Sequence, residues 1–227
     1  MKSKLAKQTE YLKDSTTREK VLKRVRNALL DPSDNPFKDL DNESSVYTSF
    51  DDEKDIQFAY ELTRSGANFI YCESPSDMLS KVKSLFEERN WTEAACREEL
   101  IEGLLEHAGV KSYREKRGMF NKIAVTSCEC LIARTGSILI SSGQDYGMRL
   151  PIACDIHVVI AFTSQVVEDI GQALTFIRSK YPQRLPSMMS VISGTARTDD
   201  LEKIMVLEGL GPKEIYLFMA DENSTDK

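Results

Sequence analysis

The sequence lacks any long hydrophobic run and any surplus of positive charge. None of its apolar stretches approaches the roughly 20 residues that a membrane-spanning helix needs. The first 20 residues contain lysines but no apolar h-region of the kind found in signal peptides. The net charge of −6 disfavours nonspecific binding to nucleic acid, because neutralising phosphates requires a basic surface. We therefore expect a cytoplasmic protein with no membrane span and no nucleic-acid partner.

Cysteine is scarce, and its spacing does not fit a metal centre. The five cysteines are an odd number and widely scattered, in a chain too large to need disulfides, so we expect reduced thiols. Cys128 and Cys130 are separated by one residue, whereas zinc sites usually separate paired cysteines by two to four. Further ligands would have to come from Cys154 or His157, and no ferredoxin spacing is present. The sequence therefore predicts no metal and no cofactor.

The composition predicts a globular domain preceded by a charged arm. Hydrophobic residues make up 41% of the 227 residues, which is ordinary for a soluble globular chain. Residues 1–51 divide into a basic segment, with a helix predicted after the Thr16–Glu19 capping box, and an acidic linker poor in aliphatic residues. We place the globular domain at residues 52–227.

Helical and strand patterns alternate through the domain. Amphipathic helices are predicted at residues 56–64, 75–86, 97–108 and 165–181, the last with Ser164 as its N-cap. Short, largely apolar strands are predicted at residues 67–72, 122–126, 137–141, 156–162, 188–192 and 215–220. Nearly continuous apolar runs are typical of strands covered on both faces. We therefore expect an α/β fold of three layers, with a parallel or mixed sheet and helices on both faces.

The stretch 188–202 has the form of an anion-binding site. A strand leads into the turn Ser193-Gly194-Thr195, and a helix restarts at Asp199, where Glu202 completes a capping box. Unpaired N–H groups and the helix dipole favour an anion there. Arg197 would add a guanidinium group, and Ser193, Thr195 and Thr198 would add hydroxyls. The turn is neither a Walker loop nor GxGxxG, and a well-capped connection with a solvated arginine is the alternative.

Two further glycine turns flank the strand at residues 137–141. Arg134-Thr135-Gly136-Ser137 leads into it, and Ser141-Ser142-Gly143-Gln144 leads out. Ligands of open α/β sheets bind at the carboxyl ends of strands, so the turns at 142–143 and 193–195 would be neighbours if their strands were parallel. Arg149, in the following loop, is a further cation that could join such a site. The alternative is that these are ordinary glycine turns.

His157 is the histidine that lies inside a strand. A single histidine in an apolar strand is usually a neutral, hydrogen-bonded core residue, and we favour that interpretation over a catalytic base.

Several motifs, taken in order, resemble one known family. They are Ala133-Arg134-Thr135-Gly136-Ser137-Ile138-Leu139, His157-Val158-Val159, Ser193 to Glu202, and Gly211-Pro212-Lys213. Together they resemble the LUD domain of the lactate utilization protein C family, over roughly residues 52–221. The resemblance implies the NagB/RpiA/CoA transferase-like fold of sugar-phosphate isomerases and coenzyme A transferases. It also implies work beside iron–sulfur subunits that oxidise L-lactate to pyruvate.

Two positions depart from the family pattern. Arg134 stands where the family usually has an acidic residue before Thr-Gly, which replaces a candidate base with a cation. The turn at 194–197 reads Gly-Thr-Ala-Arg where the family tends to Gly-Pro-Ser-Arg. Arg197, Thr198 and Asp199 match the pattern.

Our first hypothesis is an accessory component of lactate oxidation that binds a small anion, a carboxylate, phosphate or coenzyme A ester, at an edge formed by Gly136, Gly143 and Gly194. The second is a stand-alone enzyme of the sugar-phosphate isomerase or coenzyme A transferase type, with Glu129, His157 or Glu202 as its base. The third is a regulatory binding module without chemistry.

Overall fold

The computed structural model describes residues 17–30, 47–48, 50, 52–114, 121–195 and 211–222. The chain divides into two units, Met1–Thr48 and Ser49–Lys227, which are described separately. In the first unit, α2 (Thr17–Leu30) confirms the predicted helix. Its expected cap Thr16 and most of the acidic linker lie outside the described residues, and the domain boundary at residues 51–52 stays a prediction.

The second unit is built on a six-stranded sheet in which every pair of neighbouring strands is parallel. In spatial order its strands are β1 (Asn68–Cys72), β10 (Glu214–Ala220), β7 (Cys154–Phe162), β4 (Asn121–Thr126), β2 (Glu93–Ala95) and β3 (Lys111–Tyr113). The central strands β7 and β10 are apolar and buried almost throughout, as the continuous apolar runs predicted.

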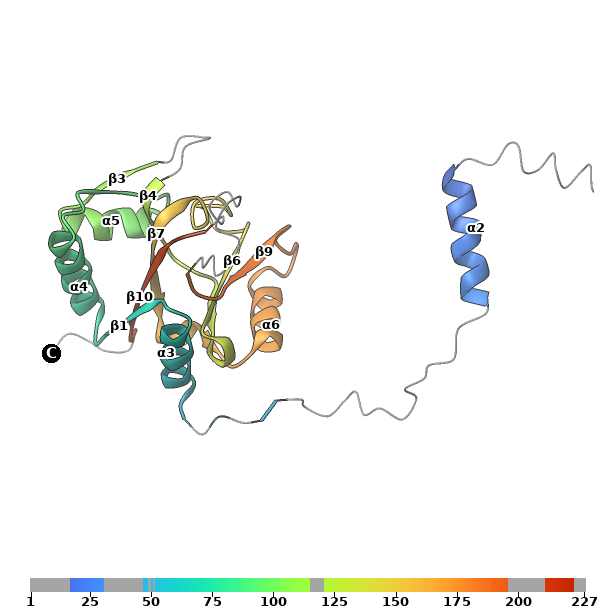
Figure 1. The fold of residues 1–227 in the computed structure, drawn as a ribbon, viewed down its shortest axis with the longest axis horizontal. Coiled ribbons are helices and arrows are strands. Elements are labelled where there is room, and N and C mark those ends of the chain that lie inside the picture. The colour runs from blue at the N-terminus through green and yellow to red at the C-terminus, as the bar shows by residue number, and fades with distance from the viewer. Residues whose placement is uncertain are drawn as a thin grey trace, which may run out of the picture. The chain divides into compact units, whose positions relative to one another are not determined.

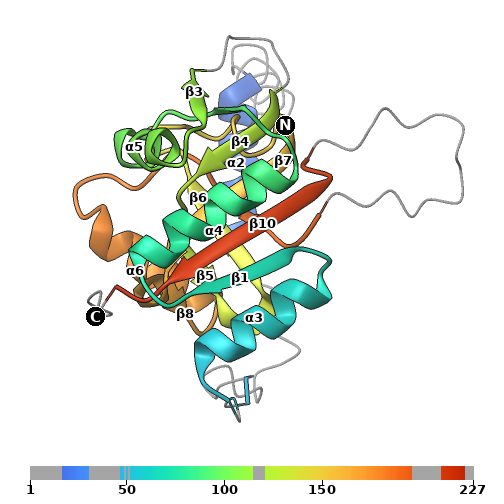
Figure 2. The ribbon, with the colours of Figure 1, turned by 90° about the vertical axis from the view of Figure 1, so that its left-hand side faces the viewer.

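Two helices cover one face of this sheet. They are α4 (Pro75–Glu88) and α5 (Glu99–His107), and Figure 2 shows α4 lying across β10. Met78, Val82 and Phe86 of α4 pack against the sheet in one core cluster. The sequence sets where α4 begins, because Ser74 accepts a hydrogen bond from the Asp77 backbone and proline occupies the first turn.

A second, smaller sheet packs on the other face together with α3 (Lys54–Arg64). Its strands are β8 (Val166–Val167), β5 (Cys130–Ile132), β6 (Ser137–Ser141) and β9 (Met189–Ile192), in that order. Helix α6 (Ile170–Lys180) covers its outer side. Figure 1 shows these layers in succession, from α4 and α5 through the two sheets to α6.

The predicted α/β class, a mostly parallel sheet flanked by helices, is confirmed. Two local predictions are wrong. Met189–Ile192 is an edge strand rather than a buried one, and Val191 is 43% exposed. The helix predicted from residue 165 begins at Ile170, capped by Asp169 instead of Ser164, because a 3₁₀ turn (Thr163–Gln165) and β8 occupy the preceding residues.

Within the described part of the chain, no helix combines the length and the apolar character needed to cross a bilayer.

Candidate functional site

Seven polar residues meet where β4 and β6 end, and we call them the carboxyl-edge cluster. Hydrogen bonds connect all of them. Five of the elements described above converge here: the carboxyl ends of β4, β6 and α6, and the beginnings of β5 and α5. The cluster consists of Glu98, Ser127, Glu129, Ser141, Gln144, Lys180 and Tyr181.

Glu129 forms the buried half of the cluster. Its side chain has no solvent exposure, and both carboxylate oxygens are engaged. The Ser141 and Tyr181 hydroxyls donate to Oε1 at 2.5 and 2.8 Å, and Lys180 Nζ donates to Oε2 at 2.7 Å. A buried carboxylate is stable only when it is paired and hydrogen-bonded in this way.

Lys180 reaches Glu129 from the surface, and its side chain remains 44% exposed. Partial burial lowers the pKa of Lys180, but the hydrogen bond and charge of Glu129 outweigh that effect and raise it overall. Burial, together with the hydrogen bond to Glu129, also raises the pKa of Tyr181. The ammonium therefore stays charged and fixed in position at the edge of the cluster.

Glu98 forms the other half. It precedes α5 and accepts two hydrogen bonds from Ser127, one from the backbone N–H at 2.7 Å and one from Oγ at 2.5 Å. Burial raises the pKa of Glu98 in spite of these bonds, and the charge of Asp145 adds to the effect. Gln144 links the two halves, because Nε2 donates to Ser127 Oγ at 3.2 Å and Oε1 accepts from the Ser141 backbone at 3.1 Å.

His157 lies in the core between the sheets. It is fully buried, and its Nε2 is 2.8 Å from Thr126 Oγ1. Burial lowers the pKa of His157 to about 3, so the ring is neutral near pH 7. This placement agrees with our interpretation of a neutral core residue, since a catalytic base must reach its substrate.

The glycine turns do not share one edge as expected. Strand β9 runs antiparallel to β6, with Ile138 opposite Ile192 and Ser141 opposite Met189. Ser142 and Gly143 therefore adjoin the carboxyl-edge cluster, whereas Gly136 and the turn at 193–195 lie at the other end of β6. The expectation of a common Gly136/Gly143/Gly194 edge is wrong, because Gly136 and Gly143 flank opposite ends of β6 and only a parallel β9 would have placed Gly194 beside Gly143.

Gly136 and Gly194 have a packing role at that other end. A Cβ atom on Gly136 would lie 2.1 Å from the Leu62 backbone nitrogen, and one on Gly194 would lie 2.6 Å from the Ser65 carbonyl oxygen. Ser193 Oγ is within 2.7 Å of Ser137 Oγ. Both glycines have positive φ angles and allow the turns to approach the end of α3.

The remaining predicted ligand residues are dispersed. The Arg134 guanidinium lies 4.5 Å from the centre of the Phe50 ring, Thr135 and Arg149 are exposed, and Thr195 is half-buried. Arg197, Thr198, Asp199 and Glu202 lie outside the described residues. Their roles in anion binding or catalysis stay predictions.

Burial disfavours the reactive thiolate form of the cysteines. All five cysteines are free and buried. Burial raises the pKa of the Cys128 thiol well above its usual range and that of Cys130 to about 12. Among the described residues, no group of three or more histidine, cysteine and acidic side chains is arranged to hold a metal ion.

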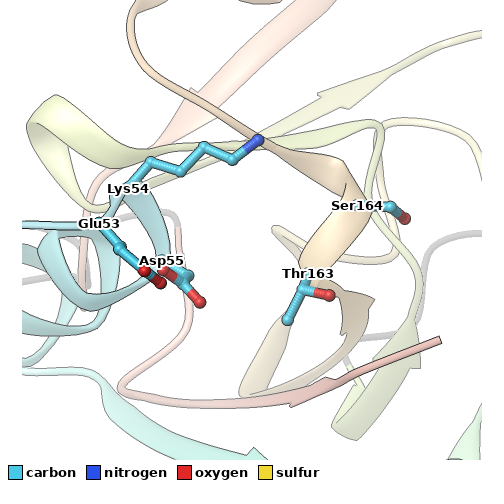
Figure 3. A pocket seen from close by; sticks show the side chains of 5 residues that line it. All are labelled: Glu53, Lys54, Asp55, Thr163 and Ser164. Atoms are coloured by element: carbon cyan, nitrogen blue, oxygen red, sulfur yellow. The ribbon is translucent and has the colours of Figure 1, made fainter. Parts of the chain in front are cut away.

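A separate pocket of about 410 Å³ lies between the start of α3 and the 3₁₀ turn after β7. Figure 3 shows Glu53 and Asp55 on one side of it and Thr163 on the other. Lys54 Nζ donates a hydrogen bond to the Val166 carbonyl at 2.7 Å. This bond connects the start of α3 to β8 and gives the lysine of the pocket a structural role. None of the predicted ligand residues lines this pocket.

Comparison with known proteins identifies the family. Residues 57–219 match the family model of the LUD domain. The chain belongs to the LUD domain family. The match covers both sheets of the second unit and the whole carboxyl-edge cluster, so the cluster is part of this chain's LUD domain rather than an addition to it.

The curated relatives of this LUD domain match a shorter stretch. The chain is 27% identical over 103 residues to the uncharacterized protein YkgG of Escherichia coli, a match covering 44% of this chain and 45% of that protein. It is 26% identical over 102 residues to lactate utilization protein C of Bacillus subtilis, covering 44% and 42% respectively. The matched stretch therefore spans less than half the length of these relatives.

The fold also has a solved counterpart. A DUF162 family protein from Deinococcus radiodurans superimposes with a TM-score of 0.58 at 16% identity, covering 74% of this chain and 96% of that one. At this identity the likeness concerns the fold alone.

Proposed function

We propose that this LUD domain protein takes part in lactate utilization by binding a small carboxylate at the carboxyl-edge cluster. The name of the Bacillus subtilis relative supports the pathway. The observation that carries the site is the Lys180 ammonium, held at the surface by the fully buried Glu129 carboxylate. Ligands of open α/β folds bind at the carboxyl ends of strands, which is where this cluster lies.

The chemistry of the cluster suits a carboxylate. An ammonium has three N–H donors, and Glu129 accepts one of them. The other two can donate to a ligand carboxylate, a charge-assisted pair that is stronger than a neutral hydrogen bond. The neighbouring Ser142 and Gly143 are exposed, so a small ligand can approach.

The oxidation of lactate also requires an electron acceptor. Converting lactate to pyruvate removes two electrons and two protons, and carboxylate, amine, amide and hydroxyl side chains do not take up the electrons. We therefore propose, from the family resemblance, that the protein works beside iron–sulfur partner proteins as an accessory component.

Calorimetric titration of the full chain tests the proposed ligand. We expect L-lactate or pyruvate to bind, and inorganic phosphate and acetyl-coenzyme A to bind much more weakly. Preferred binding of phosphate or the coenzyme A ester would favour the stand-alone enzyme instead. Absence of lactate and pyruvate binding at millimolar concentrations would overturn the proposal.

A further inference from the structure

We infer that Lys180 and Glu98 are the two poles of a 2-hydroxycarboxylate site, with Lys180 binding the carboxylate and Glu98 accepting a hydrogen bond from the 2-hydroxyl group. This inference rests on the proposed function and deepens it, because it names the residues and the chemical class that they select.

A continuous series of hydrogen bonds connects the two side chains. From Glu98 the bonds run through Ser127 and Gln144 to Ser141, and from Ser141 through Glu129 to Lys180. Glu98 bonds to Ser127, and Lys180 bonds to Glu129, only two residues further along the chain. The two poles therefore lie at the same edge of the fold, against neighbouring residues that follow β4.

Glu129 acts as a positioning residue for the lysine. Because it is fully buried and bonded to Ser141 and Tyr181, its carboxylate is fixed in position and orients the ammonium. Orientation in advance lowers the entropy lost when a ligand binds. Gly143 is part of the same arrangement, since a Cβ there would lie 2.8 Å from the Tyr181 ring.

Glu98 is suited to the hydroxyl group of the ligand. Each of its oxygens accepts one hydrogen bond from Ser127, and a carboxylate oxygen has room for a second. A ligand that carries only a carboxylate gains nothing from this group. The arrangement therefore predicts selection for lactate over propionate, which has the same carbon chain without the hydroxyl.

Surface lysine Lys81 provides a matched control. Its Nζ also lies 2.7 Å from a carboxylate, that of Asp77, and its side chain is 41% exposed. Its partner Asp77, however, is itself 29% exposed rather than buried, and the pair lies on α4, outside the cluster. Lys81→Gln should therefore leave ligand binding unchanged.

The experiment is calorimetric titration of the full chain with L-lactate and propionate. Lys180→Gln should weaken both ligands alike, by about ten- to a hundred-fold, which is the worth of a charge-assisted contact. Glu98→Gln should lower the ratio of lactate affinity to propionate affinity by about ten-fold, because the neutral amide is a weaker acceptor for the 2-hydroxyl group than the carboxylate. Equal effects of Glu98→Gln on both ligands would contradict the assignment of the hydroxyl group.

Folding of the variants is controlled by a second substitution. Lys180→Gln leaves a buried carboxylate without its cation, whereas the double variant Glu129→Gln/Lys180→Gln removes both charges and should fold. We expect this folded double variant to bind both ligands more weakly than wild type does. Lactate binding at wild-type affinity in it would overturn the inference.

The outcomes separate the two proposals. Wild type that binds neither lactate nor pyruvate overturns the proposed function. Wild type that binds lactate, with the Lys180 and Glu98 variants unchanged, overturns only the inference and moves the site elsewhere in the chain.

Discussion

Glycine is required by close packing at the start of β6, whereas a glycine inside α5 has open space around it. Gly136 has a φ angle of 58° and faces the α3 backbone, with no space for a Cβ atom. Gly103, inside α5, has nothing within 4 Å of the same position. Substitution of glycine by alanine should therefore have opposite effects on stability at these two positions.

Gly136→Ala should lower the free energy of unfolding by about 3 kcal/mol or more, because it combines a positive φ with overlap against rigid backbone. Gly103→Ala should raise it by about 0.5–1 kcal/mol, since alanine is the better helix former. Urea unfolding measures both. A neutral Gly136→Ala variant would show that the turn and α3 are not packed as described.

His157 should remain neutral over the accessible pH range. Because its pKa is lowered in the folded protein, the unfolded state binds the proton more readily. The contribution of the neutral ring to the free energy of unfolding is therefore complete above pH 6.5 and is lost as the pH falls from 6.5 toward about 3. Proton NMR can follow the ring directly, since the chain has two histidines and His107→Gln assigns the signals. A His157 resonance that titrates near pH 6.5 in the folded protein would contradict its burial.

At the scale of elements, the end of α6 is held to the second sheet by a polar contact. Ala173 and Ile177 are its buried residues, and Lys180 at its last turn pairs with Glu129. Cationic residues at this end also suit the helix dipole. The pair should therefore contribute to the docking of α6.

Lys180→Met should cost about 3 kcal/mol, because it leaves a fully buried carboxylate uncompensated. Adding Glu129→Gln should recover much of that loss, giving a coupling energy of roughly 1–3 kcal/mol in a double-mutant cycle. The exposed pair provides the reference, where Lys81→Met should cost no more than about 1 kcal/mol. Equal costs at the two lysines would mean that burial of Glu129 does not strengthen its pair.

Local patterns predicted most elements of the LUD domain but not their arrangement. Apolar runs and caps located the strands and α4, because these depend on residues near in sequence. The apolar strand at 137–141 has the same pattern in either sheet, so neither the second sheet nor the antiparallel pairing of β6 with β9 could be inferred.

The sequence pointed to only part of the candidate site, because local patterns do not show which distant residues come together. Glu129, Ser142 and Gly143 were named and lie in or beside the carboxyl-edge cluster. Glu98 and Lys180 were missed, because they look like ordinary helix-end charges in the sequence. Their partners lie 29 and 51 residues away, and only the packed fold brings them together.

At the scale of the whole molecule, the second unit has three core clusters that share their sheets. The parallel sheet separates the first two clusters, and the smaller sheet separates the first from the third, beneath α6. Disrupting either sheet therefore exposes two clusters at once. The two sheets should unfold together rather than as separate domains.

Coincident unfolding curves would test this cooperativity. The chain has a single tryptophan, and Trp91 packs against Phe86 and Tyr216, so its fluorescence reports on the cluster beneath α4. Hydrogen exchange of α6 reports on the opposite side. We expect the same urea midpoint from both, and a separate, earlier transition of α6 and the small sheet would contradict a single unit.

The most direct test of the account is a crystal structure of the protein with L-lactate bound. We predict electron density for the ligand at the carboxyl-edge cluster, with its carboxylate on Lys180 Nζ and its 2-hydroxyl group on Glu98. Density instead at the turn of residues 193–195, or no bound ligand at saturating lactate, would contradict a carboxylate site at the ends of β4 and β6.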